Sequence, residues 1–119
     1  MTSSPLVNQS LELSIKVVKL YEYLCRQRKE FVMSKQILRS ATSIGANIHE
    51  ANFAISRADF INKMQIALKE TAETEYWLIL LEATEYILED YKNLQELCKS
   101  IKRLLIATLN TSKKKVKCE

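Results

Sequence analysis

The sequence predicts an all-α protein that folds as an antiparallel, up-down-up-down four-helix bundle. Its 119 residues include a single Gly and a single Pro. Turns use Gly, Pro, Asn and Asp, so a chain this poor in the first two has few turns and long elements. Apolar residues also recur at steps of three and four along four stretches, which is the spacing of one helix face. The length suits one domain, so we expect residues 1–119 to form a single bundle.

The first helix is expected from Ser10 to Arg28. Residues at helical spacing predict its inward face, which would comprise Leu11, Ile15, Val18, Tyr21, Leu24 and Cys25. The second helix is expected from Ser34, whose hydroxyl would cap the first turn, to about Ala54. Its predicted apolar stripe contains Ile37, Ala41, Ile44, Ile48 and Ala51.

The third helix is expected from about Arg57 to Thr84, because the preceding Ser56-Arg-Ala-Asp59 resembles a capping box. Its predicted inward residues are Phe60, Met64, Ala67, Leu68, Thr71, Leu78 and Leu81. Residues 77–81 are five consecutive apolar residues, and neighbouring helix positions cannot all face one core. We therefore expect another subunit to cover part of this helix in a homo-oligomer.

The fourth helix is expected from about Glu89 to Leu109, with the acidic Glu89 and Asp90 at its positive end. Its predicted stripe contains Tyr91, Leu94, Leu97, Cys98, Ile101, Leu104, Leu105 and Thr108. The last ten residues, N-T-S-K-K-K-V-K-C-E, are expected to form a short, frayed basic tail (about 110–119).

The net charge of +4 is distributed unevenly. Residues 1–64 carry nine Lys or Arg against five Asp or Glu, residues 65–98 carry two against eight, and residues 99–119 carry seven against one. The basic segments suit a phosphate-bearing partner, and the acidic segment suits a basic neighbour. Alternatively, acidic and basic helices pair with each other within the bundle or between copies.

Neither a membrane span nor a disulfide is expected. No apolar run approaches the roughly 20 residues needed to cross a bilayer, and the N-terminus lacks the pattern of a signal peptide. The three cysteines, Cys25, Cys98 and Cys118, show no CxxC spacing and are expected to be reduced thiols. These features predict a cytoplasmic protein with no membrane partner.

His49 and Glu50 invite comparison with the H-E-x-x-H zinc motif. That motif needs a second His four residues further on, but Phe53 occupies this position and the chain has no other His. The spacing also gives no support for a Cys–His nucleophile, a glycine-rich phosphate loop or a di-metal centre of Glu-x-x-His pairs. We therefore expect no enzymatic activity, no catalytic residue, no metal and no cofactor.

The middle of the second helix carries a polar stripe beside Gly45 and Ala46, two residues that allow close approach of a neighbouring helix. Its members, Ser40, Ser43, Asn47 and Glu50, share one face. Buried Asn and Glu side chains need hydrogen-bond partners. We therefore predict a structural polar seam that fixes how helices or subunits meet, formed by Ser43, Asn47, Glu50 and Glu75, with Thr71. The alternatives are a small-molecule or RNA contact and plain exposure to solvent.

Three stretches resemble a known family, the bacterial 23S rRNA intervening-sequence proteins. L-R-S-A-T-S-I-G-A-N-I-H-E-A at 38–51 is similar to the family pattern L-R-x-A-x-S-I-[PG]-x-N-I-A-E-[GA]. The segments S-x-x-D-F-I at 56–61 and A-L-K-E-T-A-E-T-E-Y-W-L from Ala67 also resemble the family. His49 stands where the family usually has a small residue. The resemblance implies a four-helix bundle that forms a ring-like homopentamer, and the family name records gene location within ribosomal RNA genes rather than a reaction.

The basic surface and the resemblance together predict a non-enzymatic, oligomeric bundle that binds RNA or a ribonucleoprotein. The candidate residues near the first connection are Arg26, Arg28, Lys29, Lys35 and Arg39, and those on the fourth helix and the tail are Lys102, Arg103, Lys113, Lys114, Lys115 and Lys117. Contacts of this kind neutralise phosphates without reading sequence. The alternative is a protein–protein assembly scaffold that uses the acidic surface of the third helix around Trp77.

Overall fold

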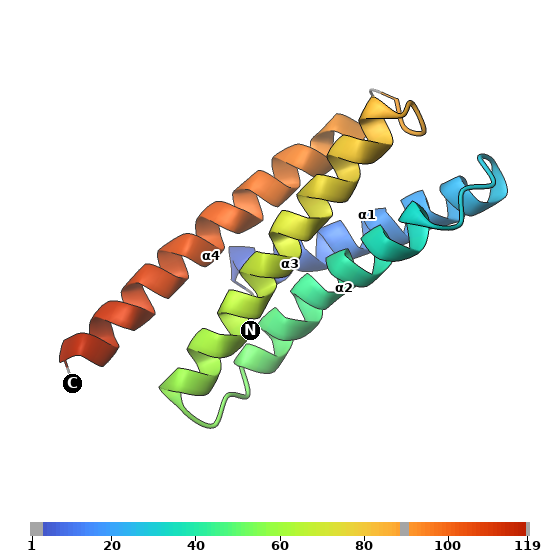
Figure 1. Cartoon of the computed structure of the whole chain (residues 1–119). Helices are drawn as coiled ribbons and strands as arrows, with labels where there is room; N and C mark the ends of the chain where they lie inside the picture. Colours follow the sequence, from blue (N-terminus) through green and yellow to red (C-terminus); the bar gives the residue numbers. More distant parts are fainter. Residues whose placement is uncertain (1–3, 89–90, 119) are drawn as a thin grey trace.

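The computed structural model describes residues 4–88 and 91–118, which form four helices (Figure 1). The helices are α1 (Pro5–Arg26), α2 (Met33–Ala51), α3 (Arg57–Ala83) and α4 (Lys92–Cys118). The described residues contain no strand. The predicted all-α four-helix bundle is therefore confirmed.

Each helix packs against its neighbours in sequence, and α1 also contacts α4. Among the described residues, the backbones of α1 and α3 do not come close to each other, and neither do those of α2 and α4, so the members of each pair lie across the core from each other. The α1–α2 and α3–α4 connections lie at one end of the molecule, and the α2–α3 connection lies at the other (Figure 1). The bundle is elongated, measuring 53 × 25 × 23 Å.

α1 begins earlier than predicted and turns a different face inward. Ser4 caps the helix by accepting a hydrogen bond from the Val7 N–H at 3.1 Å, and a Pro follows in the first turn, where no N–H is needed. The buried residues are Leu6, Ser10, Leu13, Val17, Leu20 and Leu24. The predicted inward face was wrong apart from Leu24, because Leu11, Ile15 and Val18 are exposed and Tyr21 and Cys25 are half-buried. The helix carries two apolar stripes, and periodicity alone did not identify the inward one.

Glu30 caps the start of α2, whereas the sequence predicts Ser34 as the cap. The Glu30 carboxylate accepts hydrogen bonds from the backbone N–H groups of Val32, Met33 and Ser34 at 3.2, 3.1 and 2.8 Å. The buried Ser34 hydroxyl donates instead to the carbonyl oxygen of Glu30 at 2.9 Å. α2 ends at Ala51, slightly before the predicted end, and its predicted apolar stripe is buried.

The capping segment before α3 forms much as predicted. The Ser56 hydroxyl accepts from the Asp59 N–H at 3.0 Å, and the Asp59 carboxylate accepts from the Ile55 N–H at 3.2 Å. α3 then runs to Ala83, one residue short of the prediction. Its buried residues are Met64, Ala67, Thr71, Thr74, Leu78 and Leu81, whereas the predicted Phe60 and Leu68 are half-buried.

α4 remains helical to Cys118, where the sequence predicted a frayed tail from about residue 110. No Gly or Pro interrupts the segment, and its lysines are good helix formers. Leu109 and Ser112, near the predicted end, are buried. The predicted acidic residues at the helix start, Glu89 and Asp90, lie outside the described residues.

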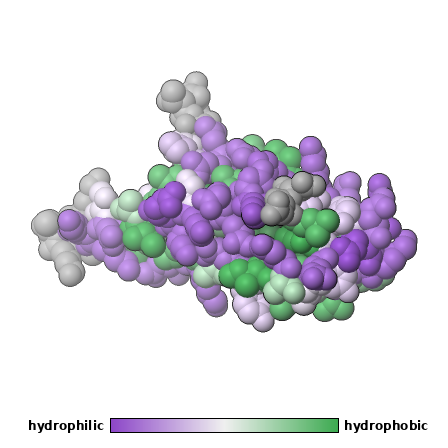
Figure 2. Space-filling model, turned by 90° about the horizontal axis from the view of Figure 1, so that it is seen from above, coloured by the Kyte–Doolittle hydropathy of each residue, from purple (hydrophilic) through white to green (hydrophobic). Residues whose placement is uncertain are grey.

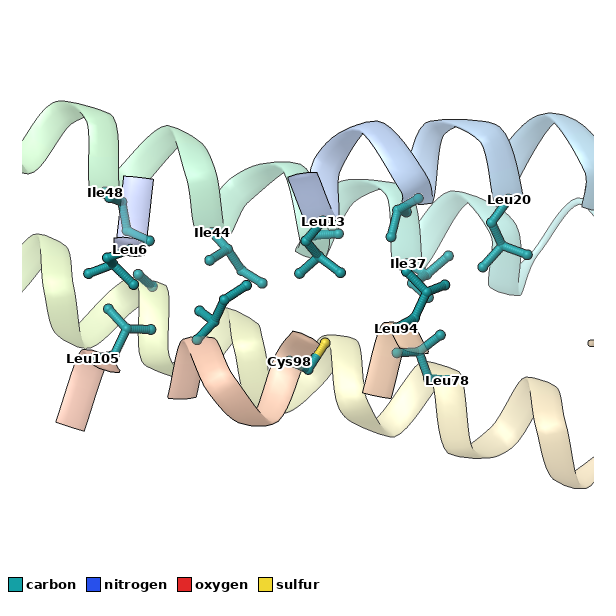
Figure 3. Packing of buried hydrophobic residues seen from close by; sticks show 14 of the residues in the cluster. Leu6, Leu13, Leu20, Ile37, Ile44, Ile48, Leu78, Leu94, Cys98 and Leu105 are labelled. Carbon is teal, nitrogen blue, oxygen red and sulfur yellow. The ribbon is translucent and has the colours of Figure 1, made fainter. Parts of the chain in front are cut away.

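The core runs along the bundle axis between the four helices. Figure 3 shows side chains from all four helices meeting there, including Leu13 from α1, Ile44 from α2, Leu78 from α3 and Cys98 from α4. These four residues are fully buried. Since the core is filled with aliphatic side chains, any contact with a partner must use the outer faces of the helices.

Candidate nucleic-acid interface

Most of the basic residues predicted to bind RNA lie in two groups at the ends of the bundle, and Arg39, Lys102 and Arg103 lie within helices between them. Arg26, Arg28, Lys29 and Lys35 surround the α1–α2 connection. The last turns of α4, with Lys113 and Lys114, lie at the opposite end of the elongated molecule (Figure 1). Within one protomer the two groups therefore do not form a single site.

Two predicted RNA-binding residues are engaged in ion pairs between helices. Arg39 on α2 pairs with Glu70 at 3.2 Å and with Glu73, and Lys102 on α4 pairs with Glu75 at 2.9 Å. The pKa of the Glu73 carboxyl is lowered, most by the hydrogen bond from the Trp77 indole N–H and next by the hydrogen bond from Arg39. Part of the acidic surface of α3 is thus neutralised within the bundle. This agrees with the alternative that acidic and basic helices pair with each other.

Arg28 joins the two connections at its end of the bundle. Its guanidinium donates to the carbonyl oxygens of Glu85 at 3.1 Å and Tyr86 at 2.8 Å, and lies 4.9 Å from the centre of the Tyr86 ring. These contacts tie the end of α1 to the α3–α4 connection. They give Arg28 a structural role, while Lys29 and Lys35 beside it are exposed.

The outer side of α4 presents a row of cations, which we call the α4 basic face and define as Lys92, Lys99, Arg103 and Lys114. These residues are exposed and recur at steps of seven, four and eleven, which keeps them on one side of a helix. The α4 segment contains eight Lys or Arg residues and one acidic residue, Glu96. At 1.5 Å per residue, the face extends over about 33 Å.

The cations of α4 differ in how far they are neutralised. Lys99 lies 3.8 Å from the exposed carboxylate of Glu96. No described residue forms an ion pair with Arg103, Lys113 or Lys114, which are all exposed. The side chains of the predicted Lys115 and Lys117 lie outside the described residues. The unpaired positive charge of α4 is therefore directed toward solvent.

The predicted polar seam does not form one network within the protomer. Asn47 donates only within α2, to the Ser43 carbonyl oxygen at 2.8 Å and to the Ser43 hydroxyl at 3.1 Å. Glu50 is exposed and pairs with Lys63 at 3.2 Å. Glu75 belongs to the separate pair with Lys102 described above.

The buried polar contact between α2 and α3 uses a residue that the sequence analysis missed. The hydroxyl groups of Ser40 and Thr74 are 2.8 Å apart, and both residues are fully buried. Thr74 lies three residues after Thr71 and four before Leu78, so its position on the inward face could have been read from the spacing. Thr71 itself donates to the carbonyl oxygen of Ala67 at 2.7 Å, within α3.

Gly45 lies where α2 approaches α1 closely. A Cβ atom on Gly45 would come 3.4 Å from the Ser14 hydroxyl and 3.7 Å from the Ser10 carbonyl oxygen. Beside it a shallow, largely apolar groove of about 290 Å³ runs between the two helices. His49 lies at its edge with its ring centre 5.6 Å from that of Phe53. The groove offers packing surface rather than a constellation of reactive groups.

The described residues contain no group of three or more His, Cys, Asp or Glu side chains that could hold a metal ion. Burial raises the pKa of the Cys98 thiol to about 12, so this buried cysteine is a neutral thiol at ordinary pH. No helix in the described part of the chain is long and apolar enough to cross a membrane.

Comparisons with known proteins agree with the fold. Residues 3–107 match the family described as "23S rRNA-intervening sequence protein". A crystal structure from Bacteroides thetaiotaomicron, of a protein with unknown function from the S23 ribosomal protein family, is 56% identical in sequence. The match covers 87% of this chain and 97% of that one, with a TM-score of 0.85. No curated protein matches the chain. Because the family match spans most of the four helices, the chain belongs to the 23S rRNA-intervening sequence protein family.

Proposed function

We propose that the protein is a non-enzymatic, self-associating bundle that binds RNA or a ribonucleoprotein through the α4 basic face. The observation that carries this proposal is the row of exposed cations along α4, with Glu96 as the one acidic residue of the helix. A rigid helix that holds cations at regular intervals can neutralise successive phosphates and release their counterions. The S23 ribosomal protein family of the similar structure agrees with an RNA partner.

The α4 basic face is a better candidate than the basic group at the α1–α2 connection. There, Arg28 is committed to the carbonyl oxygens of the α3–α4 connection, and the exposed acidic Glu85 lies at the same end. Arg39 and Lys102 are already paired with carboxylates. Phosphate binding at those residues would have to compete with existing partners, whereas Arg103 and Lys114 have none among the described residues.

Charge reversal tests the proposal. The double variant Lys99→Glu/Arg103→Glu should weaken binding to a structured ribosomal RNA fragment and reduce the slope of log K against log salt by about two. The matched control is Lys29→Glu/Lys35→Glu, which makes the same change in net charge at the other basic group. Equal losses in the two variants would indicate nonspecific attraction to net charge, and no binding by the folded wild-type protein at low salt would refute the RNA proposal.

Self-association is supported by large apolar side chains on outer helix faces. Leu11, Ile15 and Val18 on α1 and Tyr76 and Ile79 on α3 are exposed in the single chain. Contiguous exposed apolar surface is typical of interaction sites. The family resemblance points to five copies, so light scattering should give a mass near five times 13.8 kDa. A mass of one chain at micromolar concentration would contradict this part of the proposal.

A protein-binding scaffold that uses the acidic side of α3 receives less support. Glu70, Glu73 and Glu75 are paired with cations of the same chain. Trp77 is half-buried and its indole N–H donates to Glu73 at 3.0 Å. If a cellular partner remained bound after nuclease treatment and depended on α3, this alternative would replace RNA binding.

A further inference from the structure

Two apolar stripes lie on the outside of the bundle, and no described residue covers them. The α1 stripe consists of Leu11, Ile15 and Val18, which are 59%, 50% and 40% exposed. The α3 stripe consists of Ala72, Tyr76, Ile79 and Ala83. Tyr76 and Ile79 are 56% and 57% exposed, and both alanines are exposed as well. Apolar residues are also visible as patches between hydrophilic ones in the space-filling view (Figure 2).

Both stripes have the spacing of a helix–helix seam. Their members are separated by four and three residues in the α1 stripe, and by four, three and four residues in the α3 stripe. Alternating steps of three and four give the 3.5-residue repeat by which two helices pack side by side over several turns. The spacing therefore indicates a partner helix rather than a small ligand.

Hydrogen bonds place the two stripes at the same level of the bundle. The Ser14 hydroxyl, in the middle of the α1 stripe, lies 3.5 Å from the Ala41 carbonyl oxygen on α2. The adjacent Ser40 is hydrogen-bonded at 2.8 Å to Thr74, which lies on the inward face of α3 at the level of the α3 stripe. At the end of the bundle, the Arg28 side chain donates to the Glu85 carbonyl oxygen. The ends of α1 and α3 therefore also lie at a similar level along the bundle axis.

The stripes also run in the same direction on opposite sides of the molecule. α1 and α3 are the first and third helices of an up-down-up-down bundle, and among the described residues their backbones lie apart across the core. A second copy rotated about an axis along the bundle would keep its helices parallel and at the same height. Its α3 stripe would then meet the α1 stripe of the first copy without sliding along the helices.

We propose that the α1 stripe of one copy packs against the α3 stripe of the next copy, in a heterologous contact that repeats from copy to copy. This proposal rests on the self-association proposed above and names its interface. Contact between like stripes would instead be isologous, and it would leave the other stripe of each chain exposed. Charge at the edges agrees with the heterologous pairing. The exposed Glu12 beside the α1 stripe, which pairs with Lys16 of its own helix at 3.0 Å, lies within about one turn of the level of the exposed Lys69 beside the α3 stripe.

Cysteine cross-linking distinguishes the two kinds of contact. The background carries Cys25→Ser and Cys118→Ser, and the fully buried Cys98 remains. Val18→Cys and Tyr76→Cys are introduced singly and together. Under mild oxidation, the double variant should give a ladder of disulfide-linked chains extending beyond dimers, and neither single variant should be linked. The two new cysteines lie across the bundle, so they cannot be linked within one chain.

Cross-linked dimers of either single variant would overturn the proposal by showing that like stripes meet. An unlinked double variant whose mass is still a multiple of one chain would also overturn it, while self-association would stand. A wild-type protein with the mass of a single chain would refute the self-association proposal itself. As a second test, Ile15→Lys should reduce the mass toward one chain, whereas Ile55→Lys should leave it unchanged, because Ile55 is 94% exposed in the α2–α3 connection and lies on neither stripe.

Discussion

At the scale of single residues, Glu30 determines where α2 begins. Its carboxylate accepts three backbone N–H groups that have no partner within the helix. Glu30→Ala should therefore lower the free energy of unfolding by about 1–2 kcal/mol, as for the loss of a helix cap. Urea denaturation provides the measurement, and Glu22→Ala on the exposed side of α1 is the control. If both variants unfold at the same urea concentration, the Glu30 cap contributes little to stability.

Gly45 permits a sharper test, because two substitutions should have opposite effects. Its backbone is helical without a positive φ, and an added Cβ would make only ordinary contacts with α1 at 3.4 Å or more. Gly45→Ala should therefore raise the free energy of unfolding by about 0.5–1 kcal/mol through helix propensity. Gly45→Val adds two methyl groups toward Ser14 and Ser10 and should lower it. Thermal denaturation that shows Gly45→Ala to be destabilising would mean that the α1–α2 contact is tighter than these distances indicate.

At the scale of whole elements, Arg28 connects α1 to the α3–α4 connection. The guanidinium makes two hydrogen bonds and a ring contact that a Lys side chain cannot reproduce together. Both Arg28→Ala and Arg28→Lys should destabilise the protein, by about 1–2 kcal/mol for the alanine variant. Hydrogen exchange should also become faster in residues 84–88. Arg26→Ala, at an exposed neighbouring position, is the control, and equal effects of the Arg26 and Arg28 substitutions would argue against this connection.

The sequence predicted element types better than element faces. The predicted bounds of α3 lie within one residue of the observed ones, and at its start Ser56 and Asp59 give a local signal that the structure uses. For α1, two apolar stripes share the same periodicity, and the inward one is selected by packing against helices far away in sequence. The cap from Glu30 depends on the chain turning back after α1, so spacing alone pointed to Ser34 instead.

On the scale of the whole molecule, the candidate site also depends on the arrangement of helices, which local sequence patterns do not reveal. Lysine and arginine counts identified basic segments, but only the antiparallel topology separates Lys29 and Lys35 from Lys113 and Lys114. Likewise, ion pairs between helices remove Arg39 and Lys102 from the free cations. What remains is a basic face on α4 and apolar stripes on α1 and α3, so different helices carry RNA contact and self-association in the proposed function.

If both proposals hold, assembly should strengthen RNA binding without altering any RNA contact. An assembled particle presents several α4 basic faces, and binding through one face raises the effective concentration of RNA at the others. Ile15→Lys, which lies on the α1 stripe and not on α4, should therefore weaken RNA binding by about tenfold or more. The RNA affinity of this variant should also fall less steeply with salt concentration, because a single chain neutralises fewer phosphates.

The measurement is an RNA titration at several salt concentrations, with mass and circular dichroism determined on the same samples. Ile55→Lys, which adds the same charge outside the stripes, should keep the mass, the affinity and the salt dependence of the wild type. An Ile15→Lys protein that is fully helical and of single-chain mass, yet binds RNA as strongly as the wild type, would contradict this coupling. In that case each bundle would bind RNA independently, and the α1 and α3 stripes would serve only self-association.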